Sequence, residues 1–212
     1  MKILAVSDTV IDRLYSAQVA EYFRGVELIL GCGDLPFEYL EFLVSVFNVP
    51  LLFVPGNHDP QIDQHNPSAR ADGCCLLDRR VTRIKGLNLA GLGGSIRYKP
   101  VPPNQYSQHE MYWRSLSLLP GLLKIRLQTG HGLDIMIAHS PPQGIHDDNE
   151  DPAHTGFSAL RDFIRVFQPR YFLHGHTLDY KNNFAPPAAM LGATTIININ
   201  PYRVLEVEPY GK

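Results

Sequence analysis

The stretch Leu51-Leu52-Phe53-Val54-Pro55-Gly56-Asn57-His58-Asp59 decides the fold of this chain. Its first four residues are all apolar, which predicts a short buried strand. A proline and a glycine then end the strand, and an amide, an imidazole and a carboxylate follow at once. Ligands of open α/β sheets bind outside the carboxyl ends of the strands. This stretch therefore predicts a strand that carries chemically active side chains at its carboxyl end.

The preceding part of the chain shows the same arrangement twice. Apolar runs at Ile3–Ser7 and Glu27–Leu30 lead into aspartates, Asp8 directly and Asp34 after a short glycine turn. Two segments between the strands have apolar side chains at helical spacing: Tyr15–Phe23 and Phe37–Phe47. The order strand-helix-strand-helix-strand predicts a parallel sheet with right-handed crossovers. Three strand ends therefore direct polar groups to one rim.

The second half of the chain adds further strands and two histidine-bearing strand ends. His139 follows one apolar run, and His174-Gly175-His176 ends another. The expected strands are Val81–Ile84, Leu87–Leu92, Leu133–Ala138, Tyr171–Leu173, Thr194–Ile199 and Arg203–Val207. The expected helices are Gln108–Leu119, which Pro120-Gly121 interrupts, and Phe157–Phe167.

Composition favours one soluble α/β domain over residues 1–212. The chain carries 44% hydrophobic and 19% charged residues with a net charge of -2, so it has no basic patch for a long nucleic acid. Three cysteines without a framework spacing argue against a secreted disulfide fold. No signal peptide or membrane-length apolar run is present, so we expect a cytoplasmic protein with no membrane partner.

The polar residues at the strand ends form a candidate metal-binding set. They are Asp8, Asp34, Asn57, His58, Asp59, His139, His174 and His176. Carboxylate, imidazole and amide oxygen together suit manganese, iron or zinc. A lone aspartate after a strand is usually a helix cap, and a lone histidine is usually a satisfied core residue. Five such strand ends in one chain argue against that simpler interpretation.

These motifs make the sequence similar to the calcineurin-like metallophosphoesterases along nearly its full length. The family pattern is D-x-H, G-D-x-x-D, G-N-H-D/E, a lone His after a strand, and G-H-x-H. Its matches here are Gly33-Asp34, Gly56–Asp59, His139 and Gly175-His176. The resemblance implies a four-layer α/β/β/α sandwich and hydrolysis of phosphate mono- or diesters at a pair of metal ions.

Three positions depart from the family pattern. Val10 and Leu178 replace the second histidines of D-x-H and G-H-x-H, and Phe37 replaces the second aspartate of G-D-x-x-D. In the family, the two lost histidines serve one metal together with Asp8 and Asp34. Asp12 and Asp179 lie close in sequence to the vacated positions, but solvated surface carboxylates are the simpler interpretation of both.

The other metal set implied by the resemblance is complete. It consists of Asp34, Asn57, His139 and His176. We therefore expect one tightly bound divalent metal ion and an incomplete second site.

The resemblance also implies roles around the metal. His58 would lie near the leaving group as an acid or transition-state stabiliser, and Asp59 would hold its tautomer. His174 precedes the glycine and is outside the ligand register. We expect it to orient His176 or a neighbouring carboxylate, and a register shift that makes it a ligand is the less favoured alternative.

Two loops are candidate walls of a substrate site. In the first, Arg97 would grip a phosphate, Tyr98 or Tyr106 would stack on a base, and Asn104 would contribute polar contacts. An exposed loop with ordinary solvated groups is an equal alternative. The second loop, Gln143–Thr155, contains His146, His154 and an acidic run that would repel a polyanion.

The predicted function is a metal-dependent hydrolase of a small phosphate ester or nucleotide. One rival is a non-catalytic phosphate or nucleotide sensor that uses the same rim for binding. A further rival is a scaffold in which the metal is structural or absent. Substrate, metal identity and oligomeric state are not encoded in any motif of this chain.

Overall fold

The fold was analysed in a computed structural model of the chain. The structure describes residues 1–16, 18–63, 65–66, 69–100, 103–177 and 188–209.

The chain alternates strands and helices, with most strands short. The strands are β1 (Lys2–Val6), β2 (Val26–Gly31), β3 (Leu51–Phe53), β4 (Cys75–Leu76), β5 (Arg80–Ile84), β6 (Leu87–Leu92), β7 (Ser95–Ile96), β8 (Gln105–Tyr106), β9 (Ile135–Ala138), β10 (Tyr171–His174), β11 (Ala188–Leu191), β12 (Thr194–Asn198) and β13 (Tyr202–Glu206). The helices are α1 (Val19–Tyr22), α2 (Phe37–Phe47), α3 (Gln108–Leu116), α4 (Leu119–Thr129), α5 (Ser158–Phe167) and the 3₁₀ helix η2 (Pro152–His154).

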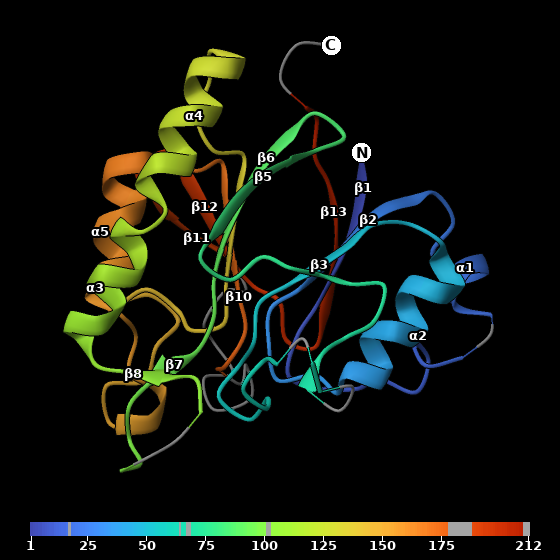
Figure 1. The fold of residues 1–212 in the computed structure, drawn as a ribbon, viewed down its shortest axis with the longest axis horizontal. Coiled ribbons are helices and arrows are strands. Elements are labelled where there is room, and N and C mark those ends of the chain that lie inside the picture. The colour runs from blue at the N-terminus through green and yellow to red at the C-terminus, as the bar shows by residue number, and fades with distance from the viewer. Residues whose placement is uncertain (17, 64, 67–68, 101–102, 178–187, 210–212) are drawn as a thin grey trace.

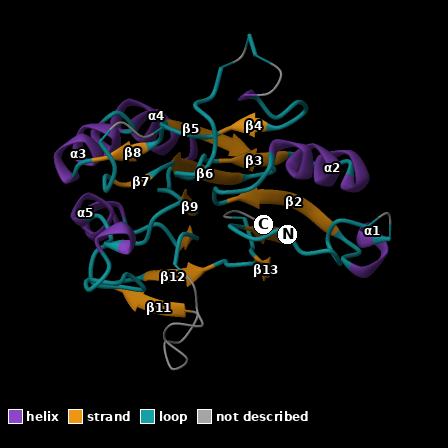
Figure 2. Ribbon diagram, turned by 90° about the horizontal axis from the view of Figure 1, so that it is seen from below, coloured by secondary structure: helices purple, strands orange, loops and turns teal. Residues whose placement is uncertain are grey.

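Two mixed sheets form the centre of the molecule. The first has the order β13-β1-β2-β3-β4 and the second has the order β11-β12-β10-β9-β6-β5. Helices α1 and α2 cover the outer face of the first sheet, and α3, α4 and α5 cover the second (Figure 1). Figure 2 shows the two helix layers on opposite flanks of the strands. The predicted four-layer α/β/β/α sandwich is therefore confirmed.

Successive side chains along each strand point to opposite faces of the sheet, and together they build three apolar layers. In β1, Ile3 and Ala5 face the core between the sheets, whereas Leu4 and Val6 pack beneath α2. In β9, Ile135 and Ile137 face the same inter-sheet core, and the next residues along pack beneath α5. Because both faces of these strands are buried, they read as continuous apolar runs in the sequence.

The predicted helix Tyr15–Phe23 is wrong over its first half. Only α1, a single turn, is helical, and residues 11–15 form turns instead. The Ser16 hydroxyl donates to the Arg13 carbonyl, and no side chain caps the start of α1. A local side-chain bond of this kind offers the backbone an alternative to the helical ladder.

The expected helix Gln108–Leu119 also ends early, and its break lies before the proline. α3 stops at Leu116, and α4 begins at Leu119 with Pro120 in its first turn. Proline suits the first turn because the amide it lacks has no partner inside the helix. Pro120 therefore starts a second helix rather than interrupting the first.

None of the helices among the described residues combines the length and the apolar composition needed to cross a bilayer.

Candidate metal centre

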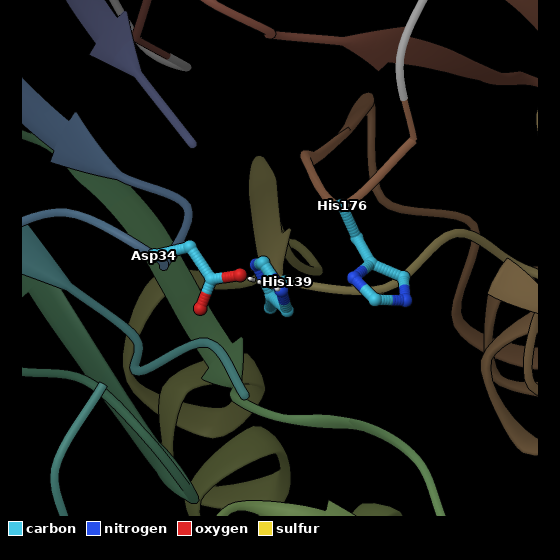
Figure 3. A group of neighbouring side chains, drawn as sticks. All are labelled: Asp34, His139 and His176. Carbon is cyan, nitrogen blue, oxygen red and sulfur yellow. Dashed lines mark ion pairs between the residues drawn. The ribbon is translucent and has the colours of Figure 1, made fainter. Parts of the chain in front are cut away.

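Strand ends from both sheets meet at one rim. Asp34 follows β2 and Asn57 follows β3 in the first sheet, and His139 follows β9 and His176 follows β10 in the second. Figure 3 shows Asp34, His139 and His176 converging from their separate strands. One ligand atom of each of these three residues lies within 4.8 Å of those of the other two.

The backbone at this rim turns sharply. Asp8, Asp34 and His176 adopt left-handed φ values of 62°, 56° and 68°. A Cβ at Gly175 would overlap the Ser7 hydroxyl and the Asp8 carboxylate, so only glycine fits before His176. Such strained turns after strands aim side chains at the rim and persist only when the surrounding structure supports them.

The orientation of His139 is fixed by the backbone. Its Nδ1 lies 2.8 Å from the carbonyl oxygen of Cys32, which only accepts hydrogen bonds, so Nδ1 carries a proton. Its Nε2 lies 3.1 Å from Asn57 Oδ1 and 3.3 Å from Asp34 Oδ2. These three atoms therefore face one another, and His139 is fully buried.

The orientation of His176 is fixed in the same way. Its Nε2 lies 2.7 Å from the carbonyl oxygen of Ala153 and therefore carries the proton. Because burial and the nearby His139 lower the pKa of His176 to about 3, the ring is neutral. Its Nδ1 lone pair remains available to a metal ion.

Charge at the centre favours a cation. Burial disfavours a charged His139, but the Asp34 and Asp8 carboxylates outweigh it and raise the pKa of His139 to about 9. Burial likewise opposes ionisation of Asp34, yet His139 holds the pKa of Asp34 at about 2. The structure therefore stabilises positive charge where Asp34, Asn57 and His139 meet.

These residues fit a divalent metal ion. One carboxylate, one amide oxygen and two imidazole nitrogens make a mixed oxygen and nitrogen set of the kind that borderline metals bind. Both imidazoles have their non-ligating nitrogen hydrogen-bonded to a backbone carbonyl, the usual support of metal-binding histidines.

Tyr98 supports Asn57 in the structure. The Asn57 amide nitrogen donates to the Tyr98 hydroxyl over 3.2 Å, which leaves Asn57 Oδ1 directed at His139. The expectation for Tyr98 was stacking on a base. Its hydroxyl orients the amide of a predicted ligand, and stacking of its ring stays a prediction.

Asp59 contacts the backbone rather than His58. Its Oδ2 accepts from the amides of Gly56 over 2.7 Å and Asp34 over 3.0 Å. Burial raises the pKa of the Asp59 carboxyl to about 6 although the Gly56 amide opposes this shift. Among the described residues, its hydrogen bonds fix the two ligand-bearing turns and not the His58 tautomer. The His58 side chain is exposed at the rim, and its amide donates to Asp34 Oδ1 over 2.8 Å.

Asp8 lies at the rim without joining the three-residue cluster. Both of its carboxylate oxygens accept the His176 amide at 3.0 Å. Burial raises the pKa of the Asp8 carboxyl, and His139 opposes this shift. Asp8 therefore holds the turn that presents His176.

The other predicted substrate residues are engaged within the protein. Arg97 makes an ion pair with Glu110 of α3 at 2.8 Å and donates to the Gln105 carbonyl. The Asn104 amide donates to the carbonyl oxygen of Asp59 over 3.0 Å. Asn104 thus ties its loop to the G-N-H-D turn, and Arg97 ties the same loop to α3.

His174 contacts a different partner from the expected ones. Its Nδ1 lies 3.0 Å from the Gly175 carbonyl, and its Nε2 lies 2.9 Å from His146 Nδ1. Burial and the neighbouring His146 lower the pKa of His174 to about 3. The contact between the two rings joins β10 to the loop of residues 144–156, which follows β9.

That loop contains the support that sequence reasoning missed. Asp151 accepts from the Ala153 amide over 3.0 Å and lies 2.7 Å from His154 Nδ1, so it holds the turn whose Ala153 carbonyl meets His176. Asp147 accepts from the amides of Gly144 and Gly156. The spacing of these acids within a histidine-bearing loop is the available signal in the sequence.

The position of the missing second metal site is only partly described. Val10 is half-buried and packs against the core beneath α2. Leu178 and Asp179 lie outside the described residues. Within the described residues, the one group of three or more acidic, histidine or cysteine side chains arranged for a metal is Asp34, His139 and His176.

Comparisons with known proteins bear on the family and the fold. The profile of the calcineurin-like phosphoesterase family matches residues 1–180. An uncharacterised protein of Methanocaldococcus jannaschii is 26% identical over 214 residues, covering 95% of this chain and 88% of that protein. An uncharacterised protein of Haemophilus influenzae is 28% identical over 145 residues, covering 58% of this chain and 60% of that protein.

A solved structure shares the fold. The crystal structure of TT1561 of Thermus thermophilus has a TM-score of 0.63 at 19% identity, covering 93% of this chain and 88% of that one. This likeness supports the layer arrangement and says nothing of the reaction.

Proposed function

Because the chain belongs to the calcineurin-like phosphoesterase family, we propose that it hydrolyses a small phosphate mono- or diester with a divalent metal ion. The observation that carries the proposal is the convergence of Asp34, His139 and His176 within 4.8 Å. The orientation of the two histidines adds to it, because each has one ring nitrogen bonded to a backbone carbonyl and its other nitrogen available for the cluster with Asp34.

The metal would be held by Asp34, Asn57, His139 and His176. Manganese, iron and zinc suit this mixed set of ligands. When bound, the ion would stabilise negative charge on the phosphoryl oxygens as a Lewis acid. The lost family histidines at Val10 and Leu178 support a single ion rather than two.

His58 is the proposed proton donor to the leaving oxygen. Its side chain is exposed beside the centre, and its amide bond to Asp34 keeps it on the same turn as Asn57. General acid catalysis of this kind contributes about 10²–10⁴ to the rate.

A cavity beside the centre offers room for the alcohol part of the ester. It measures about 370 Å³ and is lined by Asp34, His58, Phe37 and Arg70, among others. That volume is at the small end of ligand sites, which supports a small substrate rather than a polymer.

We place the reaction in the cytoplasm. The three cysteines lack the framework spacing of a secreted disulfide fold, which supports a reducing compartment.

Hydrolysis of p-nitrophenyl phosphate and bis(p-nitrophenyl) phosphate with added Mn²⁺ tests the proposal, together with the metal content of the purified protein. We expect turnover that EDTA abolishes. The His176→Ala variant should lose both turnover and the bound metal. We expect His58→Ala to keep the metal while kcat falls about 10²-fold or more. His109→Ala, which removes an exposed histidine on α3, is the matched control and leaves both unchanged.

The alternative outcomes are distinct. If the protein binds metal and nucleotides stabilise it thermally without turnover, it is a non-catalytic nucleotide sensor and not a hydrolase. If the protein responds to neither metal, chelator nor nucleotide, the remaining hypothesis is a scaffold in which the metal is structural or absent.

A further inference from the structure

A groove far from the metal centre is lined almost entirely by apolar side chains. It lies between α4 and the end of α5 and has a volume of about 590 Å³. Its lining includes Leu119, Leu122, Leu123, Arg126, Leu133 and Val166. We call it the α4 groove.

The edges of the α4 groove are strongly exposed. Leu123 is 61% exposed and Val166 is 72% exposed, on the two helices that form its sides. Leu127, one turn after Leu123 on α4, is 77% exposed. Leu119, Leu123 and Leu127 recur every four residues and so form one stripe along the helix. A continuous apolar surface of this kind marks a binding site, because its exposure to water is costly.

The α4 groove and the metal centre lie at opposite ends of the same strand. Leu133 lines the groove just before β9 begins, and His139 follows the carboxyl end of β9. In Figure 1 the later part of α4 extends beyond the end of α5, away from the remaining layers. A ligand in the groove would leave the rim open.

Charge around the α4 groove is positive. α4 carries Lys124 and Arg126 and has no acidic residue. Two copies packed through α4 would bring these cations together without a compensating carboxylate on either helix. This argues against a second copy of the chain as the occupant.

The shape of the surface distinguishes a protein from a membrane. Amphipathic segments enter a bilayer with an outward apolar face that sinks into the lipid. Here the apolar residues line a concave groove between two helices, the form that receives a helix of a partner protein.

We propose that the α4 groove binds an amphipathic helix of a partner protein, with acidic residues flanking its apolar stripe. Leucine-type side chains of that helix fill the groove. Its carboxylates meet Lys124 and Arg126 at the edge.

Selection from a displayed library of helical peptides tests this. The probes carry leucine at i, i+3, i+4 and i+7, and every other position is randomised. We expect the selected peptides to be rich in Asp and Glu and to bind Leu123→Glu about tenfold more weakly or worse. The double variant Lys124→Glu, Arg126→Glu is expected to select basic peptides instead. These residues are exposed, so the variants fold, and thermal melts verify this.

Met190→Glu is the matched control, because Met190 is 62% exposed on β11 and lies outside the groove. It should bind the selected peptides as the wild type does. The proposal is overturned if the selected peptides are not enriched in acidic residues. It is also overturned if they bind Leu123→Glu as tightly as they bind the wild type. A dimer in sedimentation that Leu123→Glu dissociates overturns it in favour of a second copy. Binding to phosphatidylcholine–phosphatidylserine vesicles that the same variant abolishes overturns it in favour of a membrane.

Discussion

His176 Nε2 lies 2.7 Å from the carbonyl oxygen of Ala153, a residue 23 positions earlier in the chain. This contact fixes which nitrogen of His176 is protonated and so which one can bind a metal. The loop that follows β9 therefore completes the metal centre although it supplies no ligand itself.

Removal of Asp151 should weaken metal binding. Its carboxylate holds both the Ala153 amide and the His154 ring, so Asp151→Ala frees the turn that presents the Ala153 carbonyl. We expect Mn²⁺ affinity, measured by calorimetric titration, to fall about tenfold, as for other residues that support metal ligands. Asp148→Ala is the control in the same loop. The Asp148 side chain accepts from the Glu150 amide, and its bond to the His154 carbonyl comes from the backbone amide, which alanine retains. Equal Mn²⁺ affinities for the two variants would show that Asp151 does not support the metal ligand His176.

Gly175→Ala should destabilise the fold. A Cβ there would overlap Ser7 and Asp8, so the turn before His176 must shift. We expect a loss of about 1–3 kcal/mol in the free energy of unfolding, measured with urea. Gly132→Ala is the matched control, because no atom lies within 4 Å of its added Cβ. A stable Gly175→Ala protein would show that this turn is not tightly packed.

The sheet and its rim could be predicted from sequence because buried strands leave a direct signal. Runs with a single polar side chain, such as Leu87–Leu92 with Asn88, mark strands that are buried on both faces, and β6 has these bounds. The four-residue α1 could not be predicted from apolar spacing, since a local bond from Ser16 competes with the helix. The two-residue strand β8 carries no such run.

Glu110 gives a pH dependence that can be assigned to one side chain. Hydrogen bonds from the Ser107 amide and hydroxyl, and then Arg97, lower the pKa of Glu110 from 4.5 to about 2. A depressed pKa in the folded state stabilises the protein above pH 4.5, and this contribution is lost as the pH falls towards 2.

The variant Glu110→Gln tests this assignment. It should be less stable than the wild type by about 0.5 kcal/mol at pH 7, the usual size for an exposed ion pair. The difference should shrink below pH 4.5 in urea titrations. A difference that stays constant down to pH 3 would contradict the assignment.

Restoring the two missing family histidines should create a second metal site. We expect Val10→His combined with Leu178→His to raise the metal content from about one ion per chain towards two, since imidazole suits these metals. Elemental analysis measures this, with Val10→His alone as the control that stays near one. A double variant that still holds one ion would show that the assignment of the two sites is wrong.

The candidate metal cluster could be located from sequence, whereas the groups that orient its side chains could not. Each ligand follows a strand and carries a chemically distinctive side chain. Their partners are mainly backbone atoms, such as the Cys32 carbonyl on His139 and the Ala153 carbonyl on His176. A carbonyl has the same identity at every position of a sequence, so only the fold shows which one is used. Tyr98 was noticed for its ring, but its hydroxyl makes the contact with Asn57.

The left-handed backbone at Asp8, Asp34 and His176 separates two kinds of evolutionary constraint. Aspartate and asparagine adopt this conformation readily, so folding alone can retain them at two of these positions. At position 176, glycine or asparagine would satisfy the backbone with less strain than an imidazole. A histidine kept there reports selection for its ring. The residue at this one position should therefore distinguish relatives that bind metal from relatives that retain only the fold.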